Sequence, residues 1–291
     1  MKKILTLCIG FAALLSGCSL SQGYGHVEKF EMEAPAAPEL RGVGNYQDSR
    51  TFKIRASGNV HLGKSEKEKI SGIKNNMDNC GAITSCQKFR RDEVQEKVDA
   101  TYKITYPIAT ANLDFLAKRD VFLWGGSVGF DKGMSANLIL GVNTKHFEAG
   151  LAIGAWAYNR DFTYSGTEYS CSKLLIWEDF YQTDMEDSSS MGLAITYGGF
   201  ASIYSGPVSL NFSFSMYRPD PSFPTNSDAS LFAKKGNTIA NFDMPLVMTE
   251  YFTVGYRITP KWEARVGVAN TFGEFPDWHW SATGGISYYL K

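Results

Sequence analysis

The sequence predicts an all-β fold, an antiparallel up-and-down transmembrane β-barrel of about ten strands, with eight or twelve as the alternative counts. Segments of roughly 10 residues alternate apolar and polar side chains with a period of two, which is typical of strands whose two faces meet different surroundings. The polar face of several segments consists of Ser, Asn, Thr and Gly, which favours a crowded lumen over a water-exposed sheet. After residue 17 no apolar run approaches the ~20 residues of a membrane helix, so the chain would enter a bilayer as strands.

The expected strands lie within residues 51–291, which we predict to be the barrel domain. Tight turns at "NTKH", "SGP" and "TPK" alternate with long connections at 64–97, 159–189 and 219–245, as in meandering hairpins with large loops at one end. Residues 109–119, which include "NLDFLAK", are expected to be a connection with at most a short helical turn. An even number of strands would bring both chain ends to one side of the membrane. The expected strands are 51–63, 98–108, 120–130, 134–143, 146–158, 190–204, 207–218, 246–258, 262–272 and 280–290.

Alternation alone leaves open which face points inward, because a soluble barrel has apolar residues inside and a membrane barrel has them outside. Segments 207–218 and 280–290 have no charge on their polar face, which favours the membrane barrel. Glu250 is an exception on the apolar face, and either a position near the lipid headgroups or a register shift is expected there. Aromatic residues gather near expected strand ends, where a girdle would contact the membrane interfaces. These residues are Tyr106, Trp124, Trp156, Tyr158, Tyr204, Trp262, Trp278, Trp280 and Tyr288.

Residues 1–17 are typical of a signal peptide, with two lysines, an apolar stretch and small residues at the end. The motif "LSGC" that ends at Cys18 resembles the lipobox of bacterial lipoproteins. The resemblance implies cleavage before Cys18 and attachment of diacylglycerol to its thiol; Ser19, in place of an Asp, implies the outer membrane. A plain secretory signal that contains a cysteine is the alternative. Residues 18–50 have two prolines, several Gly and Glu and no apolar period, which predicts a lipidated, flexible tether.

The last expected strand ends in "TGGISYYLK". Thr283, Gly285, Tyr288 and Leu290 resemble the C-terminal recognition signal of bacterial outer-membrane β-barrels. The chain departs from the usual form because it ends in Lys291 and has Leu290 where an aromatic residue is common. Together the two resemblances imply the lipoprotein-processing and barrel-assembly machineries as partners, and outer-membrane lipids, including lipopolysaccharide, as surroundings.

Three cysteines remain in the mature chain besides Cys18, in an exported and oxidising setting. Cys80 and Cys86 enclose the short loop "CGAITSC" and are the predicted disulfide. Cys171 would then be free or would bond with one of them. No His lies close to these cysteines in the sequence, so neither a metal site nor a cofactor is expected.

Charged side chains on the polar face are expected to lie in the lumen and to pair across it, because unpaired charges in a narrow interior are costly. This predicts a lumen plugged by small polar and charged side chains. A narrow channel for small solutes is the alternative, and a wide porin is disfavoured because it typically needs ~16 strands. The expected lumen charges are Lys53, Arg55, Asp99, Lys103, Glu148, Arg257, Glu263 and Arg265.

The formal net charge is -1 and no block of like charge persists, which excludes the usual footprint of a nucleic-acid-binding protein. The predicted function is an outer-membrane β-barrel lipoprotein with a structural, surface-binding or narrow-channel role and no catalytic residues. One alternative is a soluble periplasmic β-barrel or sandwich lipoprotein that binds an apolar ligand. The second is a rim enzyme, a protease or lipid-modifying protein. It would be similar to the omptin proteases if Asp277 and His279 met the carboxylates of Asp184, Glu186 and Asp187.

Overall fold

A computed structural model describes residues 21–42, 44, 50–71, 98–172, 178–219, 244–274 and 277–290. The predicted signal peptide, Cys18 and the predicted Cys80–Cys86 disulfide lie outside the described residues. Among the described residues, no helix is long and apolar enough to cross a membrane.

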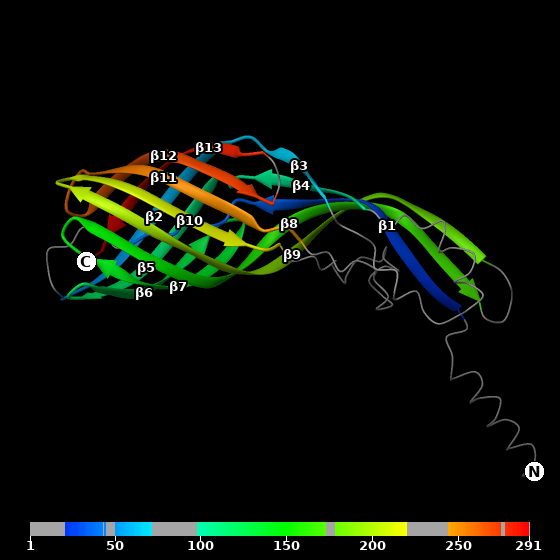
Figure 1. Ribbon diagram of the computed structural model, residues 1–291, viewed down its shortest axis with the longest axis horizontal. Coiled ribbons are helices and arrows are strands. Elements are labelled where there is room, and N and C mark those ends of the chain that lie inside the picture. Colours follow the sequence, from blue (N-terminus) through cyan, green and yellow to red (C-terminus); the bar gives the residue numbers. More distant parts are fainter. Residues whose placement is uncertain are drawn as a thin grey trace, which may run out of the picture.

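Ten antiparallel strands form the closed wall of a barrel, as the sequence predicts (Figure 1). The sheet order is β8-β7-β6-β5-β2-β13-β12-β11-β10-β9, and pairing of β8 with β9 closes the ring. Neighbouring strands follow each other in the chain except where β2 joins β5 and β13. The wall strands are β2 (Arg50–Gly63), β5 (Ala109–Arg119), β6 (Phe122–Phe130), β7 (Gly133–Asn143), β8 (Phe147–Ser172), β9 (Glu178–Ser205), β10 (Val208–Tyr217), β11 (Val247–Arg257), β12 (Trp262–Gly273) and β13 (His279–Tyr289).

One wall strand differs from the sequence prediction. The expected strand 98–108 contributes β4 (Asp99–Thr105), which lies outside the wall, and the expected connection 109–119 is the wall strand β5. Within β5, Phe115 is exposed, whereas its neighbours Asp114 and Leu116 are buried, so the side chains do alternate. The inward-facing Leu116 interrupts the apolar and polar alternation, and this hides the strand in the sequence.

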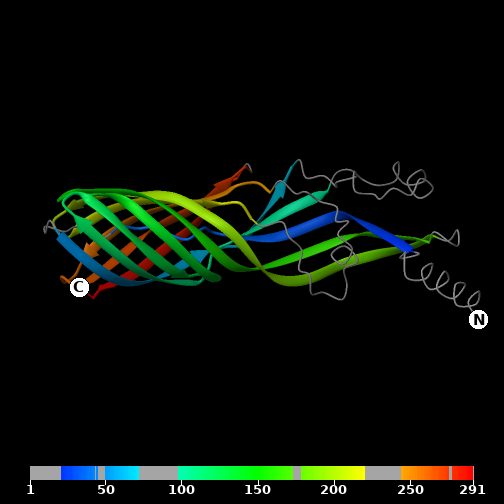
Figure 2. The same ribbon diagram turned by 90° about the horizontal axis from the view of Figure 1, so that it is seen from below.

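A β-extension continues from one end of the wall (Figures 1 and 2). It consists of β1 (Ser21–Pro35), β3 (Glu66–Ile70), β4 and the far halves of β8 and β9. β8 and β9 have 26 and 28 residues, whereas the other wall strands have 9 to 14. β1 pairs antiparallel with β8 and parallel with β4, and β3 pairs with β4. Residues 21–35 are therefore a strand in the range where the composition predicts a tether.

The two ends of the barrel differ. We call the end with the connections 120–121, 144–146, 206–207 and 258–261 the turn end, and the opposite one, which has the β-extension, the mouth end. β2 begins and β13 finishes at the turn end, where Arg50 pairs with Arg119 and Tyr289 pairs with Arg55. Because β1 lies at the mouth end, the two ends of the described chain are on opposite sides of the wall, in contrast to the prediction.

The polar face of the wall points inward and the apolar face points outward. Ser57, Thr249 and Ser287 are buried, whereas Leu62, Leu138 and Leu151 expose 78, 69 and 69% of their surface. An apolar outer surface around a closed ring of strands is the arrangement that a bilayer requires, since every strand edge is paired. The face pattern therefore excludes the soluble barrel with an apolar interior.

The residues predicted for the girdle divide into two groups, apart from Tyr288 of β13, which is half-buried. Trp124, Trp262, Trp278 and Trp280 are exposed at the ends of strands, as expected for an interfacial girdle. Four residues predicted for the girdle face inward instead and are buried: Tyr106, Trp156, Tyr158 and Tyr204.

Glu250 stays on the outward face of β11. The pairings of β11 with β10 and β12 run without a register shift, so no bulge turns the carboxylate inward. Glu250 lies three positions from Val247, where β11 begins at the mouth end. Of the two expectations for this residue, the position near a membrane edge fits the structure.

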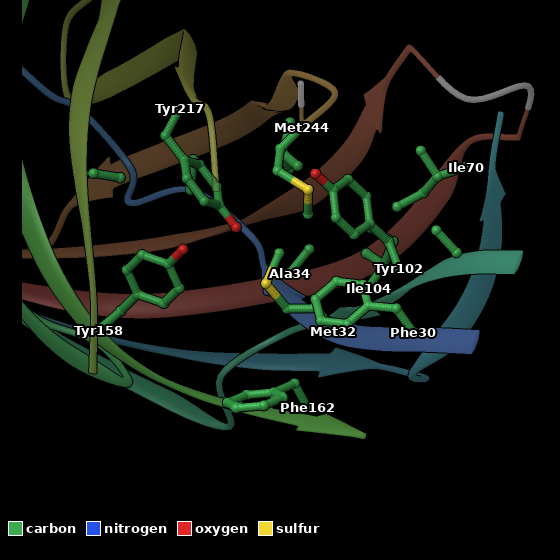
Figure 3. Packing of buried hydrophobic residues seen from close by; sticks show 14 of the residues in the cluster. Phe30, Met32, Ala34, Ile70, Tyr102, Ile104, Tyr158, Phe162, Tyr217 and Met244 are labelled. Carbon is green, nitrogen blue, oxygen red and sulfur yellow. The ribbon is translucent and has the colours of Figure 1, made fainter. Parts of the chain in front are cut away.

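A hydrophobic cluster fills the mouth (Figure 3). β1, β4 and β8 supply Met32, Ile104 and Phe162, and β10 adds Tyr217 to the same cluster. The hydroxyl of Tyr102 on β4 donates a hydrogen bond of 3.2 Å to the carbonyl of Pro245, and this connects the extension to the wall. The main hydrophobic core therefore lies in the mouth, and the rest of the lumen is mostly polar, with a smaller hydrophobic cluster that includes Leu40 and Leu116.

Candidate functional site

The lumen contains a segment of the chain itself. After Pro35 the backbone leaves β1 and enters the barrel as residues 36–42 and 44, which we call the lumen segment. Near the mouth, the hydroxyls of Tyr217, Tyr251 and Ser215 donate hydrogen bonds to the carbonyls of Pro35, Ala37 and Pro38 at 2.7, 2.6 and 2.6 Å. These wall hydroxyls satisfy backbone groups that have no strand partner.

The lumen segment reaches the turn end. The amide of Gly44 donates a hydrogen bond of 3.1 Å to Glu148, and Asn143 donates one of 3.1 Å to the carbonyl of Gly44. Both wall residues flank the 144–146 turn. The nine-residue path from Pro35 to Gly44 spans at most about 30 Å when extended, which matches the hydrocarbon thickness of a bilayer. The lumen segment therefore crosses the barrel from the mouth to the turn end.

Buried charges hold the middle of the lumen segment. Glu39 lies 2.8 Å from Arg41 and 3.3 Å from Arg265 of β12, and Asn59 of β2 accepts hydrogen bonds from both arginines at 3.0 and 2.8 Å. The side chains of Glu39 and Arg265 are 5 and 3% exposed. A charge so far from water is tolerated only with partners of this kind. The network therefore fixes the register of the lumen segment against the wall.

Further polar contacts surround the lumen segment toward the turn end. Arg55 forms an ion pair of 2.8 Å with Asp114 and donates a hydrogen bond of 2.6 Å to the carbonyl of Gly42. The hydroxyl of Tyr204 donates one of 2.6 Å to Glu148, which also accepts the Gly44 amide. The wall thus uses charged groups from both halves of the chain to hold one backbone.

The structure brings most of the predicted lumen charges together. Arg55, Glu148, Glu263 and Arg265 are buried inside the wall. Lys53 and Arg257 lie at the turn end, 5.4 and 5.2 Å from the ring of Tyr289. Two positions need correction because they belong to β4, which pairs with β1 and β3 outside the wall: Asp99 and Lys103.

Three important lumen charges escape the sequence prediction. Glu39 and Arg41 lie in the range assigned to a tether, and Asp114 lies in the range assigned to a connection. The charge balance of the predicted lumen residues does indicate that carboxylates are missing from the set. With β4 removed, the predicted set has four cations and two anions, and Glu39 and Asp114 supply the lacking negative charge.

Little free space is left in the lumen beside this charged network. The cavity beside Glu39, Arg41 and Arg265 has a volume of about 20 Å³. A single ordered water needs roughly 10–15 Å³ on this measure. The lumen around this charged network is therefore filled.

A second polar site lies in the β-extension. A pocket of about 430 Å³ is lined by Glu31 and Glu33 of β1, Lys103 of β4, and Asp161 and Ser189 of β8 and β9. Lys67 and Lys132 pair with Glu31 and Glu33. Among the described residues, Lys103 and Asp161 form no ion pair, so the pocket offers one ammonium and one carboxylate that are not already paired.

At the rim, the carboxylates closest to His279 in the described structure come from β3. The two ring nitrogens of His279 face Glu66 and Glu68 of β3 at 2.7 and 3.0 Å. Burial raises the pKa of Glu68, and the nearby Asp277 and Glu66 add to this effect while His279 opposes it. Glu186 and Asp187 pair with Tyr164 and Thr163 of β8 in the extension. His279 thus attaches β3 to the wall.

No group of three His, Cys, Asp or Glu side chains within the described ranges is arranged to hold a metal ion. Cys171 lies on β8, where it pairs with Glu178 of β9. The positions of the C-terminal signal lie on or next to β13, the last strand, and alternate as its pleat requires: Thr283 is buried and Leu290 is exposed.

These features define the class of the protein: a closed ten-stranded transmembrane β-barrel of the outer-membrane type, with its own chain inside. No protein-family model matches the sequence, and no curated protein matches it.

Three solved structures show a remote likeness. The NanC porin is 8% identical over 81% of this chain and 98% of its own, with a TM-score of 0.32. A loop L8 deletion mutant of OmpT, an outer membrane protein of Vibrio cholerae, is 10% identical over 84 and 100%, with a TM-score of 0.17. The outer membrane channel DcaP of Acinetobacter baumannii is 9% identical over 85 and 100%, with a TM-score of 0.19. These TM-scores are low, and the class rests on the strands of this chain alone.

Proposed function

We propose that this protein is an outer-membrane lipoprotein with a structural and surface-binding role. In this proposal the wall anchors the β-extension at one face of the membrane, and the lumen segment keeps the barrel closed. The lumen segment carries the proposal, because the space left beside its charged network is about 20 Å³, which holds about one water and no larger solute.

The proposed orientation places the turn end in the periplasm, as is usual for barrels with short turns on one side. The β-extension then lies at the cell surface. Ser21, at the start of β1, is three positions after the predicted lipidation site Cys18. The lipid would therefore be attached on the side opposite the C-terminal signal at Thr283, Gly285, Tyr288 and Leu290, through which the barrel-assembly machinery would act.

The pocket in the β-extension supports the binding role. Lys103 and Asp161 offer opposite charges from different strands around a volume of about 430 Å³. Lipopolysaccharide is the proposed partner at the cell surface, with a phosphate at Lys103 and sugar hydroxyls at the carboxylates. The double variant Lys103→Ala with Asp161→Ala should retain several-fold less lipopolysaccharide after purification, and equal retention would argue against this partner.

Conductance in planar bilayers tests the closed lumen. The wild-type protein should show no steady conductance, because the lumen segment remains in place. Glu39→Ala combined with Arg41→Ala removes the charges that hold the segment, and this variant should open transient channels. Lys67→Ala, on an exposed ion pair outside the wall, is the control and should stay silent. A steady ion current through the wild-type protein would sink the structural role and favour the narrow channel.

A further inference from the structure

The outer surface of the wall has a hollow where β13, β2 and β5 lie side by side. Its volume is about 880 Å³. The floor is made of residues with little or no side chain, and larger apolar residues form the margins. The floor includes Ala56, Gly58, Ala111 and Gly284, and the margins include Phe130 and Trp262.

Packing does not force the hollow to exist. A Cβ at Gly58 would meet only the carbonyl oxygen of Thr110, at 3.7 Å, and a Cβ at Gly284 would meet only that of Arg265, also at 3.7 Å. Both are ordinary van der Waals contacts, so larger side chains would fit. Elsewhere the wall presents leucine and isoleucine on this face, as at Leu138 and Ile153. The small residues therefore leave a space that the fold itself does not require.

The surroundings of the hollow indicate what fills it. It lies on the apolar outer face of the wall, and no charged side chain lines it. The rings of Trp262 and Tyr288, 4.7 Å apart, stand at its turn end, where aromatic side chains mark the membrane interface. A lipid with several phosphates would be held by Lys or Arg, and the lining has neither.

We propose that the hollow is a binding groove for an acyl chain of a membrane phospholipid whose headgroup lies at the turn end. The acyl chain fills the space over Gly58 and Gly284. Trp262 and Tyr288 cover the part of the acyl chain that lies next to the headgroup, at the turn end. Dispersion attraction between the acyl chain and the floor replaces the attraction that an empty hollow would forfeit. The choice of the leaflet next to the turn end follows from the aromatic pair, and the groove itself does not depend on the proposed closed lumen.

A second copy of the chain fits the hollow poorly. In a two-fold symmetric dimer the same surface patch meets itself. Two hollows would then face each other and enclose a void between the walls, which forfeits dispersion attraction on both sides. An acyl chain is flexible and convex, and it complements a single concave surface.

Native mass spectrometry of the protein purified in a mild detergent tests the groove. The wild-type barrel should retain one phospholipid, and Gly58→Leu combined with Gly284→Leu should reduce the lipid-bound fraction about tenfold. Ala136→Leu combined with Ala155→Leu is the matched control, because these exposed residues pair across β7 and β8 on another part of the wall. The control should retain the phospholipid.

Heat-modifiable migration on a gel shows whether each variant forms the barrel. If the leucine pair does not fold, Gly58→Ala with Gly284→Ala adds only the two Cβ atoms and should give a smaller, graded loss of lipid. Wild-type protein without a bound phospholipid, or equal retention in the groove-filling and control variants, would overturn the proposal. A wild-type dimer that the groove-filling variants dissociate would overturn it in favour of a second copy.

Discussion

Glu39 and Arg265 are 226 positions apart in the chain, and their side chains meet at 3.3 Å inside the barrel. One belongs to the lumen segment and the other to wall strand β12. The pair joins the N-terminal region to the C-terminal half of the wall, so the barrel and its contents form one unit. The interior of this barrel is thus part of its core, although it is polar.

Removal of the carboxylate should destabilise the whole barrel. Glu39→Ala leaves Arg41 buried without an ion pair and Arg265 with only its longer contact of 3.7 Å to Glu263, and an unpaired buried charge costs on the order of 3 kcal/mol. Urea unfolding in detergent, monitored by the gel band of the folded barrel, measures the change in the free energy of unfolding. Lys67→Ala breaks the exposed pair with Glu31 and should cost no more than about 1 kcal/mol. Equal losses for the two variants would mean that the buried network does not hold the lumen segment.

A methyl group at Gly42 should displace the part of the lumen segment that lies near the turn end. A Cβ at this position would lie 2.1 Å from the carboxyl carbon of Glu148. Glu148 can move only if it gives up its hydrogen bonds with Tyr204 and Gly44, each worth roughly 1.5–3 kcal/mol because one partner is charged. Gly42→Ala should therefore lower the urea midpoint clearly, whereas Gly58→Ala on the outer face should leave it nearly unchanged. A Gly42→Ala protein as stable as wild type would contradict the tight packing at this point.

The sequence predicts the wall well because each wall strand shows its two environments in its own residues. Ser57 and Ser213 point into the lumen, and their apolar neighbours point out, so the period of two is visible locally. Even β5 fits this pattern except at Leu116, which is inward and apolar and packs with Leu40 of the lumen segment in one hydrophobic cluster. That exception depends on a partner 76 positions away, which no local pattern contains.

The lumen segment could not be predicted in the same way. Pro35 and Pro38 give its range the composition of a tether, and the segment has no regular hydrogen bonding of its own. Its order comes from hydroxyls and charges of distant wall strands, such as Tyr251 and Arg265. The one local signal is the alternation of Phe30, Met32 and Ala34 with charged residues, which marks β1 as a strand. Glu39 and Arg41 can be assigned to the lumen only when the path of the lumen segment is known.

The turn between β6 and β7 should make the barrel sensitive to pH. Burial raises the pKa of Asp131 from the ordinary value of 3.8 to about 7, and the neighbouring Lys132 opposes this only in part. Because the folded state binds the proton more tightly than the unfolded state, this contribution to stability is complete below pH 3.8. It is lost as the pH rises to about 7. On a heat-modifiable gel, the band of the folded barrel should thus convert to the unfolded band at a lower temperature at pH 8 than at pH 5. Asp131→Asn should reduce this difference in temperature. An unchanged difference in the variant would assign the pH dependence to other groups.

The crossing of the lumen segment predicts that the two ends of the chain are reachable from opposite sides of the membrane. Lys29 on β1 and Lys261 in the last turn are both exposed, the first beyond the mouth and the second at the turn end. Single cysteines at these positions, in a chain whose cysteines other than Cys18 are replaced by serine, can be labelled on intact cells with a maleimide that does not cross membranes. Lys29→Cys should be labelled on intact cells and Lys261→Cys only after the outer membrane is opened. The reverse pattern would invert the proposed orientation. Labelling of both or neither on intact cells would show that the lumen segment does not carry the chain across the membrane. Ten wall strands return the chain to the same side, so the one further crossing inside the barrel must place its ends on different sides.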